Sequence, residues 1–455
     1  MAATRFDPDG PLRGALRPPP DKSISHRAAI IGAMGDSQMR VEGYLDAADT
    51  RSTLDAVRAL GAEVRELGPS ADHPGGIDLA IGGIGLRGPS ENAGGEPPAI
   101  DVGNAGTLIR LLPGWLAGQP AGAWILDGDE SIRRRPVDRI AEPLRAMGAE
   151  IEAADGRLPP LRVAGAKLEG ISYRMPVASA QVKSCLLLAG LLAAGETSVI
   201  ESAPTRDHTE RMLRAAGVEL GTAAVRTQVA LRGRLPGERI TVRAVERLAL
   251  DHQPVPADFS SGAFALVAAV LVRGSEVTVS GVGLNPTRIG LLGILNRMGA
   301  GIEVIEGLPV AGEPRGSVTA RHGAPLAGVR VGGGEVPLAI DELPLVALLG
   351  CFAEGETIVS GAEELRHKES DRIGAVVEGL GALGAEIEAT GDGFAVRGHG
   401  GLDGGTLDSC GDHRLAMLGA VAGLASRDGV EVEGFEAAGV SYPGFEADLE
   451  SLLRR

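Results

Sequence analysis

Two patterns of apolar and polar residues alternate along the chain. The first is an Ala-, Leu- and Gly-rich segment that is apolar on nearly every side, followed by a short polar turn and a strand-like stretch. A helix without a polar face must be buried, so this pattern predicts a buried helix leading into a strand. Its copies occupy residues 26–43, 107–128, 181–202, 261–281, 343–361 and 414–434.

The second pattern places apolar residues three and four positions apart and ends in glycine before a strand. It predicts an amphipathic helix. The copies are 54–64, 141–151, 209–220, 291–304 and 376–389, and a sixth helix is expected over 445–455. Gly61, Gly148, Gly217, Gly299 and Gly384 stand where a helix C-terminus favours a left-handed residue.

Together the two patterns define a unit of about 70–85 residues that occurs six times. One unit alone would leave its apolar helix uncovered. We therefore expect an α/β (α+β) protein with three units around each of two cores. The prolines Pro254 and Pro256 predict a hinge between the two halves, near Val255 to Asp258.

The charge balance excludes some classes of function. The 455 residues carry 44 basic and 60 acidic side chains, a net charge of −16, and only 3% are aromatic. A general nucleic-acid binder needs a basic surface and stacking residues, so that class is excluded. A small anion remains a suitable ligand, because local cations can outweigh the global charge.

Other counts bear on location and chemistry. The longest apolar stretch, Cys185 to Ala194, is too short to span a bilayer. Three cysteines without CxxC spacing fit a reducing cytoplasm. Lysine occurs only at Lys22, Lys167, Lys183 and Lys368 in this Arg-rich chain, so each is a candidate for chemistry that arginine cannot perform.

Polar residues precede every buried helix, in DKSISHR (21–27), GNAGT (103–107), ASAQVKS (178–184), ADFSS (257–261), AIDELP (339–344) and GDHR (411–414). Helix N-termini attract anions. Lys22, Arg27 and Arg414 oppose the helix dipole at these starts, which favours a bound anion. Helix capping is the favoured explanation for Asp258 to Ser261, and it is the structural alternative for Asp341.

The amphipathic helices also have polar leaders, in SIRRRPVDR (131–139), PTRDHTER (204–211), NPTRIG (285–290) and ELRHKESDR (364–372). Arg133 to Arg135 fit a solvated face as well as a site. The spacing of Lys368, Glu369 and Arg372 favours one helical face, and a surface salt-bridge stripe explains it as well as a site does. No metal-binding spacing occurs, and His208 and His252 are interpreted as polar surface residues.

These motifs converge on one family. The segments PDKSISHRA (20–28), GNAGTLIR (103–110), RRPVDRI (134–140), SAQVKS (179–184), TRDHTE (205–210), IDELP (340–344), LRHKESDR (365–372) and DHRLAM (412–417) resemble, in order, the 5-enolpyruvylshikimate-3-phosphate synthase family. The resemblance implies a two-domain inside-out α/β barrel with three βαβαββ units per domain and the active site in the cleft. We expect one domain over 21–255 and the other over 1–20 plus 256–455.

The resemblance also implies the reaction: transfer of enolpyruvyl from phosphoenolpyruvate to the 5-hydroxyl of shikimate 3-phosphate, with release of phosphate, in aromatic amino-acid biosynthesis. Asp341 would be the base, Glu369 would move protons on the methylene carbon, and Lys22 is a second candidate acid. The residues implied to bind shikimate 3-phosphate are Lys22, Ser23, Arg27, Ser179, Ala180, Gln181, Arg206, Asp341 and Lys368. Those implied for phosphoenolpyruvate are Lys22, Gly106, Arg135, Gln181, Arg372 and Arg414.

The expected partners are these two small anions alone, bound by a cytoplasmic monomer that contacts neither nucleic acid nor membrane. No metal or cofactor is implied, because fixed cations can stabilise the developing charge.

The sequence departs from the family pattern at three positions. Pro20 stands where the family commonly has Gly, Ala180 replaces a frequent Ser, and Val440 replaces a frequent Lys. Several motifs resemble the glyphosate-tolerant class, but Gly106 does not, since that class usually has Ala there. Because glyphosate occupies the phosphoenolpyruvate subsite in this family, Gly106 predicts inhibition by glyphosate.

Two alternatives remain. UDP-N-acetylglucosamine enolpyruvyl transferase shares the fold and the donor, but it usually carries a Cys on a loop within about 110–135, where this chain has none. A non-catalytic anion-binding repeat protein would not need an acid and a base beside its cations.

Overall fold

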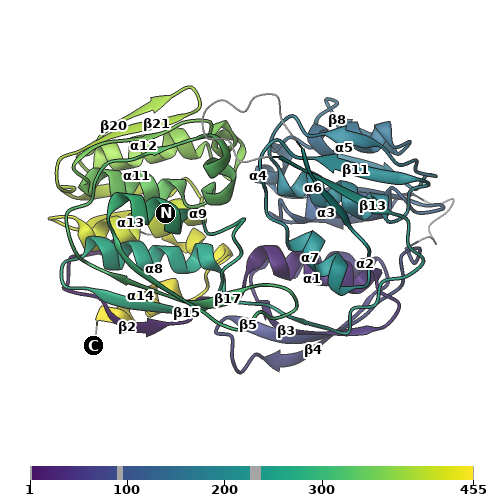
Figure 1. The fold of residues 1–455 in the computed structure, drawn as a ribbon, viewed down its shortest axis with the longest axis horizontal. Helices are drawn as coiled ribbons and strands as arrows, with labels where there is room; N and C mark the ends of the chain where they lie inside the picture. Colours follow the sequence, from purple (N-terminus) through teal and green to yellow (C-terminus); the bar gives the residue numbers. More distant parts are fainter. Residues whose placement is uncertain (1–2, 90–95, 226–236, 454–455) are drawn as a thin grey trace.

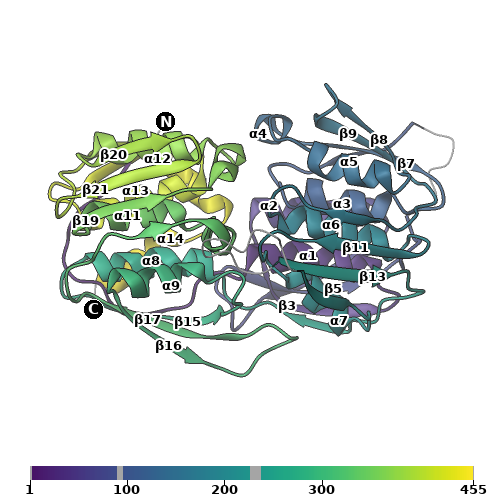
Figure 2. The ribbon, with the colours of Figure 1, turned by 45° about the horizontal axis from the view of Figure 1, so that its top comes forward.

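The computed structural model describes residues 3–89, 96–225 and 237–453. The chain forms two lobes of similar build (Figures 1 and 2). The blue and teal lobe holds the first half of the chain, and the green and yellow lobe holds the second half. Both termini lie in the green and yellow lobe, so the N-terminal strands belong spatially with the second half.

The six predicted buried helices are present, and most of their residues are shielded from solvent. They are α1 (Lys22–Met34), α3 (Leu108–Leu116), α6 (Ala180–Gly190), α8 (Phe259–Leu271), α11 (Leu343–Phe352) and α13 (His413–Ala425). Their Ala and Gly residues allow close approach: a Cβ on Gly114 of α3 would lie 2.2 Å from the carbonyl oxygen of Cys185 in α6. Small residues therefore permit the packing between neighbouring units.

The amphipathic helices are also present. They are α2 (Ala48–Ala59), α5 (Asp138–Ala146), α7 (His208–Ala215), α9 (Gly290–Met298), α12 (Arg372–Ala382) and α14 (Phe445–Leu453). The five predicted glycines after the first five of these helices all have φ between 85° and 106°, which confirms the left-handed C-termini. Residues 454–455 of the expected last helix lie outside the described residues.

The described strands form six sheets. Those of the first lobe are β14 (His252–Pro254)-β3 (Gln38–Leu45)-β5 (Gly76–Gly82)-β4 (Glu63–Pro69), β6 (Ala99–Asp101)-β7 (Ala123–Asp127)-β9 (Leu158–Ala164)-β8 (Glu150–Ala154), and β10 (Ser172–Arg174)-β11 (Glu196–Ile200)-β13 (Gly237–Arg243)-β12 (Gly221–Val225). Those of the second lobe are β2 (Arg13–Leu16)-β15 (Glu276–Gly283)-β17 (Arg315–Arg321)-β16 (Gly301–Glu306), β18 (Arg330–Val331)-β19 (Gly355–Val359)-β21 (Gly393–Gly398)-β20 (Glu386–Thr390), and β22 (Gly405–Asp408)-β23 (Val430–Glu433)-β1 (Ala3–Phe6). In each four-stranded sheet a parallel pair is followed by two antiparallel partners.

The N-terminal strand completes the sixth repeat. In the last sheet β22 and β23 are parallel, and β1 takes the antiparallel place that β9 or β21 holds in its own sheet. The chain crosses between the lobes after β2 and again after β14. The two crossings run side by side, with Asp21 N donating to Pro256 O at 2.8 Å and Asp258 N donating to Pro19 O at 2.8 Å.

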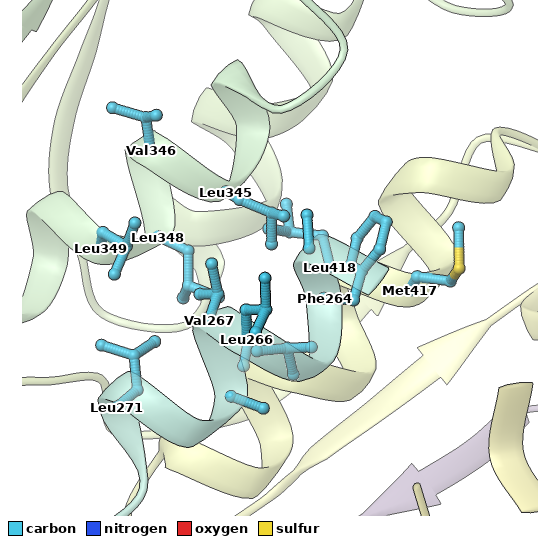
Figure 3. Packing of buried hydrophobic residues seen from close by; sticks show 14 of the residues in the cluster. Phe264, Leu266, Val267, Leu271, Leu345, Val346, Leu348, Leu349, Met417 and Leu418 are labelled. Atoms are coloured by element: carbon cyan, nitrogen blue, oxygen red, sulfur yellow. The ribbon is translucent and has the colours of Figure 1, made fainter. Parts of the chain in front are cut away.

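Each lobe has its own hydrophobic core. One cluster of buried side chains spans Ile24 to Val255, and the other joins Phe6, Leu12 and Leu16 to residues from Ala257 to Leu452. Figure 3 shows the second core, where Phe264, Val267 and Leu348 from α8 and α11 pack together. In the part of the chain that the structure describes, no helix is long and apolar enough to cross a bilayer.

Candidate active site

A cavity between the lobes collects the polar leaders predicted from the sequence. Each of the six buried helices contributes lining residues from its N-terminal end or from the polar segment before it. The four polar segments that precede amphipathic helices contribute lining residues as well. The cavity is lined by Lys22, Ser23, Asp49, Gly106, Thr107, Arg110, Arg135, Gln181, Arg206, Asp258, Ser260, Ser261, Phe264, Arg288, Asp341, His367, Lys368, Glu369, Arg372, His413, Arg414, Met417 and Ser441. The repeated fold thus points the N-terminal ends of its buried helices at one place.

Capping explains some of these polar residues. Asp258 caps α8, where its carboxylate accepts from Ser260 N at 2.7 Å, as predicted. Asp341 has a different role, because the N-cap residue of α11 is Glu342 and neither carboxylate caps the helix. The structural alternative for Asp341 is therefore wrong, and its carboxylate faces the cavity instead.

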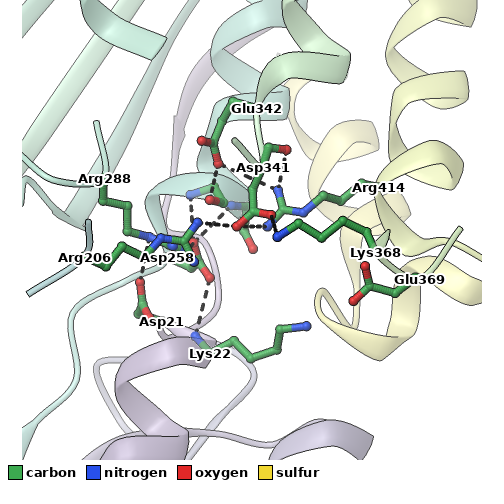
Figure 4. A network of polar contacts seen from close by, with 12 residues as sticks. Asp21, Lys22, Arg206, Asp258, Arg288, Asp341, Glu342, Lys368, Glu369 and Arg414 are labelled. Carbon is green, nitrogen blue, oxygen red and sulfur yellow. Dashed lines mark hydrogen bonds and ion pairs between the residues drawn. The ribbon is translucent and has the colours of Figure 1, made fainter. Parts of the chain in front are cut away.

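Asp341 lies at the centre of four cations, and Figure 4 labels three of them, Arg206, Lys368 and Arg414. Its carboxylate forms an ion pair with Arg206 from the other lobe, and it lies 3.5 Å from Lys368 Nζ and 3.4 Å from Arg372 Nη1. Arg414 Nη2 is 3.7 Å away. Burial favours the neutral acid, but these cations together hold the pKa of Asp341 well below its usual range. The carboxylate is therefore ionised while it is surrounded by them.

Glu369 occupies a second cationic environment beside the first. It lies 2.6 Å from Arg372 Nη2, and it is 3.4 Å from Arg135 Nη1 of the opposite lobe. Burial opposes ionisation, and Arg372 and Arg135 outweigh it, so the pKa of Glu369 is well below its ordinary value. The spacing of Lys368, Glu369 and Arg372 does not reflect one helical face, since only Arg372 lies in α12.

The cations of the two lobes are not left facing one another. Arg206–Asp341, Arg135–Glu369 and Arg139–Glu364 all cross between the lobes, the last at 2.5 Å. Lys22 Nζ is paired at 2.9 Å with Asp49 of its own lobe. Carboxylates thus relieve the repulsion between cations, and an anionic ligand would have to displace them.

Most of the predicted site residues line the cavity, but three do not. Arg27 is buried below it, with Nε donating to Thr209 at 2.8 Å and Nη2 donating to Ser184 at 3.0 Å. Burial lowers the pKa of Arg27 to about 10. Ser179 caps α6 and Ala180 begins it, next to the cavity-lining Gln181.

The four lysines separate into two kinds. Lys22 and Lys368 line the cavity, as expected for lysines with a chemical role. Lys183 is 1% exposed and pairs with Glu201 at 3.1 Å and Glu210 at 2.7 Å, so it is structural. Lys167 is exposed on a loop.

The prediction for the two histidines is half right. His252 is half-exposed, but His208 is buried and lies 2.7 Å from Glu313 of the other lobe.

In the arginine run, Arg133 pairs with Asp127 on the surface, while Arg135 is buried in the cavity wall. The run from Arg133 to Arg135 therefore contains both a solvated surface residue and a residue of the site.

Sequence reasoning missed several lining residues. Asp49, Arg110, Arg288, His413 and Ser441 all face the cavity. Arg288 belongs to the polar segment NPTRIG (285–290). Its guanidinium lies 3.1 Å from Asp21 Oδ2 and 2.9 Å from Asp258 Oδ1, beside the two chain crossings. Asp49 and Ser441 gave no local signal, because only the fold brings them to the cavity. Ser441 lines it beside the position where Val440 replaces the family's lysine.

The described residues contain no group of three or more His, Cys, Asp or Glu side chains placed to hold a metal ion. The charged side chains of this cavity are arginines, lysines and carboxylates.

Comparison with solved structures defines the class. The enolpyruvyl transferase NikO from Streptomyces tendae superimposes with a TM-score of 0.71 at 19% identity, over 99% of this chain and 97% of the other. The fold is therefore that of the enolpyruvyl transferases. An EPSP synthase structure from Acinetobacter baumannii agrees more fully, with a TM-score of 0.81 and 38% identity over 98% of this chain and 97% of the other.

Sequence comparison identifies the family. The family model described as EPSP synthase (3-phosphoshikimate 1-carboxyvinyltransferase) matches residues 6–449. The 3-phosphoshikimate 1-carboxyvinyltransferase of Thermus thermophilus is 49% identical over 453 residues, which cover 99% of this chain and 98% of the relative. That of a Synechococcus strain is 45% identical over 452 residues, or 99% and 98% of the two chains. The chain belongs to the EPSP synthase family.

Proposed function

We propose that this chain transfers the enolpyruvyl group of phosphoenolpyruvate to the 5-hydroxyl of shikimate 3-phosphate and releases phosphate. The observation that carries the proposal is the gathering of cations from both lobes around two ionised carboxylates, Asp341 and Glu369. Two phosphorylated carboxylate substrates need several cations, and the reaction needs groups that accept and return protons. The family relationship supports the same activity.

The proposed subsites divide the cavity. Shikimate 3-phosphate is assigned to Lys22, Ser23, Arg27, Ser179, Ala180, Gln181, Arg206, Asp341 and Lys368. Phosphoenolpyruvate is assigned to Lys22, Gly106, Arg135, Gln181, Arg372 and Arg414. Arg27, Ser179 and Ala180 do not line the cavity, so the proposal requires them to contact ligand at its edge or to act through Ser23 and Gln181.

Charge redistribution accounts for the proposed chemistry. The substrate anions compete for Arg206, Lys368 and Arg372, which now stabilise the ionised form of Asp341. As these cations turn to the substrates, the pKa of Asp341 rises and the carboxylate becomes a better base. It then accepts the proton of the 5-hydroxyl as that oxygen bonds to C2 of phosphoenolpyruvate.

The remaining steps need a proton carrier at the methylene carbon. As phosphoenolpyruvate draws Arg372 and Arg135 away from Glu369, the pKa of Glu369 rises and its carboxylate takes up a proton from solvent. Glu369 is proposed to give this proton to that carbon and later take one back, with Lys22 as the second candidate acid. Breaking the bond between C2 and the phosphate oxygen then regenerates the double bond and releases phosphate. Fixed arginines stabilise the developing charge without reorganisation.

The deciding experiment is phosphate release on mixing both substrates, compared with either substrate alone. We expect release only with both. Replacing shikimate 3-phosphate by UDP-N-acetylglucosamine tests the sister activity, and release with that acceptor alone would contradict the proposal. Absence of release with either acceptor would favour a non-catalytic anion-binding protein. The family matches do not favour these two alternatives.

We also propose the domain limits as 21–255 and 1–20 plus 256–455, which the membership of the two hydrophobic clusters supports. A monomer is proposed because one chain supplies both walls of the cavity. The cytoplasm is proposed as the compartment, and all three cysteines being free is consistent with it.

A further inference from the structure

A second group of polar side chains, with His208, Asn285 and Glu313 buried at its centre, joins the lobes beside the cavity. It comes from the residues that directly follow Arg206 and from the first turn of α7. Asp207, His208 and Arg211 contact three residues of the second lobe, namely Asn285, Gly312 and Glu313. The expectation that His208 is a surface residue missed this contact, because the partner lies 105 positions away in the chain.

The geometry of this group is that of a built interface. His208 Nδ1 lies 2.7 Å from Glu313 Oε1, and both side chains are 2% exposed or less. Asn285 Nδ2 donates to Glu313 Oε2 at 3.1 Å and to Asp207 Oδ1 at 2.7 Å. Arg211 Nη1 donates to the carbonyl oxygen of Gly312 at 2.6 Å. Three side chains of the first lobe are thus each bonded to the second lobe.

The hydrogen in the central contact can be placed. An ionised carboxylate only accepts, so Nδ1 of His208 carries the hydrogen that Glu313 receives. The Nε2 atom of His208 is buried without a partner, so the contact with Glu313 is the one that satisfies this ring. Burial opposes ionisation of Glu313, but His208 and Arg211 hold its pKa below the ordinary value.

Arg206 is held between two anchors. On its N-terminal side, Thr205 hydrogen-bonds to the Glu201 carboxylate, and its carbonyl oxygen accepts from Lys183 at 3.2 Å within the first lobe. On its C-terminal side, Asp207 and His208 bond to the second lobe. The Arg206 side chain itself reaches Asp341 across the cavity.

We propose that His208 and Glu313 are positioning residues, which form an interlobe latch that holds Arg206 against the second lobe in the arrangement seen here, in which both lobes line the cavity and which we call closed. This inference rests on the proposed function, in which Arg206 binds shikimate 3-phosphate. Separating the lobes breaks the latch, so the latch raises the fraction of molecules that are closed. Apparent affinity scales with that fraction, so losing the latch weakens binding without removing any proposed ligand contact.

The test compares two substitutions of one residue. His208→Leu removes the Nδ1 donor and keeps much of the bulk, whereas His208→Asn keeps an amide donor near the same position. We expect His208→Leu to raise the dissociation constant for shikimate 3-phosphate about tenfold, measured by calorimetry, and His208→Asn to restore most of the affinity. At saturating substrate kcat should stay within about threefold of the parent, because the ligand itself then closes the lobes.

A matched control is available in the same chain. His252 Nε2 lies 3.2 Å from Glu42 Oε2, but both belong to the first lobe and are part-exposed. His252→Leu should leave the dissociation constant unchanged. Should His208→Leu prove unfolded by circular dichroism, Glu313→Gln and Asn285→Ala test the latch from the other lobe, with the same loss of affinity expected.

The outcomes separate the two proposals. Phosphate release by the parent tests the proposed function, and the ratio of variant to parent affinity tests the latch. Equal affinities of an active parent and a folded His208→Leu variant would overturn the latch alone. Additive effects of His208→Leu and Glu313→Ala on affinity would also overturn it, because residues that act as one contact lose their effect together.

Discussion

Arg206 and Asp341 form an ion pair across the cavity, although 135 residues separate them in the chain. Arg206 follows strand β11 of the first lobe, and Asp341 precedes the buried helix α11 of the second lobe. The pair places a proposed substrate-binding cation directly on the proposed base. In the proposed function, one guanidinium therefore couples substrate binding to activation of the base.

Asp341→Asn should abolish most turnover and keep the binding of shikimate 3-phosphate. Asparagine retains the shape but cannot act as the base, and loss of a general base costs ~10²–10⁴-fold in kcat. Removing the negative charge leaves Arg206, Lys368, Arg372 and Arg414 freer to bind an anion, so affinity should be equal or higher. Steady-state kinetics and calorimetry measure the two effects. Asp403→Asn, at an exposed pair with Arg427, is the charge-matched control, and parent-like turnover of Asp341→Asn would place the base elsewhere.

Gly106→Ala should weaken glyphosate more than phosphoenolpyruvate, and the parent should be inhibited by glyphosate. A Cβ on Gly106 would lie 2.5 Å from Arg135 Nη1 and 3.4 Å from Arg110 Nη1. The methyl would thus displace the Arg135 guanidinium as well as narrow the subsite. We expect the inhibition constant to rise at least ~10-fold, the usual effect of one methyl on discrimination, and the KM for phosphoenolpyruvate to rise less.

The control for this prediction is Gly293→Ala, because a Cβ there meets nothing within 4 Å. Inhibition assays on the three proteins provide the measurement. A parent that tolerates millimolar glyphosate and is unaffected by Gly106→Ala would show that this methyl does not decide tolerance here.

Lys183→Met should destabilise the fold by about 3–5 kcal/mol, because it leaves Glu201 and Glu210 as buried carboxylates without their cation. Burial lowers the pKa of Lys183, but the two glutamates outweigh this and raise it, so the lysine is charged at neutral pH. Urea unfolding measures the loss. Lys167→Met, at the exposed lysine, should change stability by less than about 0.5 kcal/mol, and equal effects of the two substitutions would contradict the buried network.

Acid should destabilise the parent more steeply than Asp341→Asn. The folded protein holds the pKa of Asp341 well below the unfolded value of about 3.9, so below that pH the unfolded chain binds the extra proton. The stability contributed by the ionised group is present above pH ~4 and is lost as the pH falls further. Thermal midpoints between pH ~7 and ~3 measure the slope. Identical slopes for both proteins would show that Asp341 titrates normally in the fold.

Local pattern was sufficient to predict the helices, their glycine C-termini and the six repeats. These features depend on residues a few positions apart, such as the glycine after each of five amphipathic helices, and the pattern repeats along the whole chain. The leaders rich in arginine, lysine and acidic residues were also visible, and they identified most of the cavity wall.

Residues whose role depends on a distant partner were interpreted less well. His208 looked like a surface histidine because Glu313 is absent from its neighbourhood in sequence. By sequence alone Lys183 is as good a candidate for chemistry as Lys22, and only burial beside Glu201 and Glu210 separates the two. Arg27 begins a helix like an anion-binding residue, yet its guanidinium is bonded to Thr209 and Ser184.

The sequence by itself determined the repeating helices and strands and supplied the charged leaders, since periodicity and helix capping act over a few residues. The tertiary structure decided which of those charges meet. It moved β1 into the last sheet, carried the chain twice between the lobes and set Arg206 against Asp341. Coulomb energy depends on distance and on burial, and neither is a property of local sequence. For that reason the state of Asp341, ionised among four cations, could be known only from the fold.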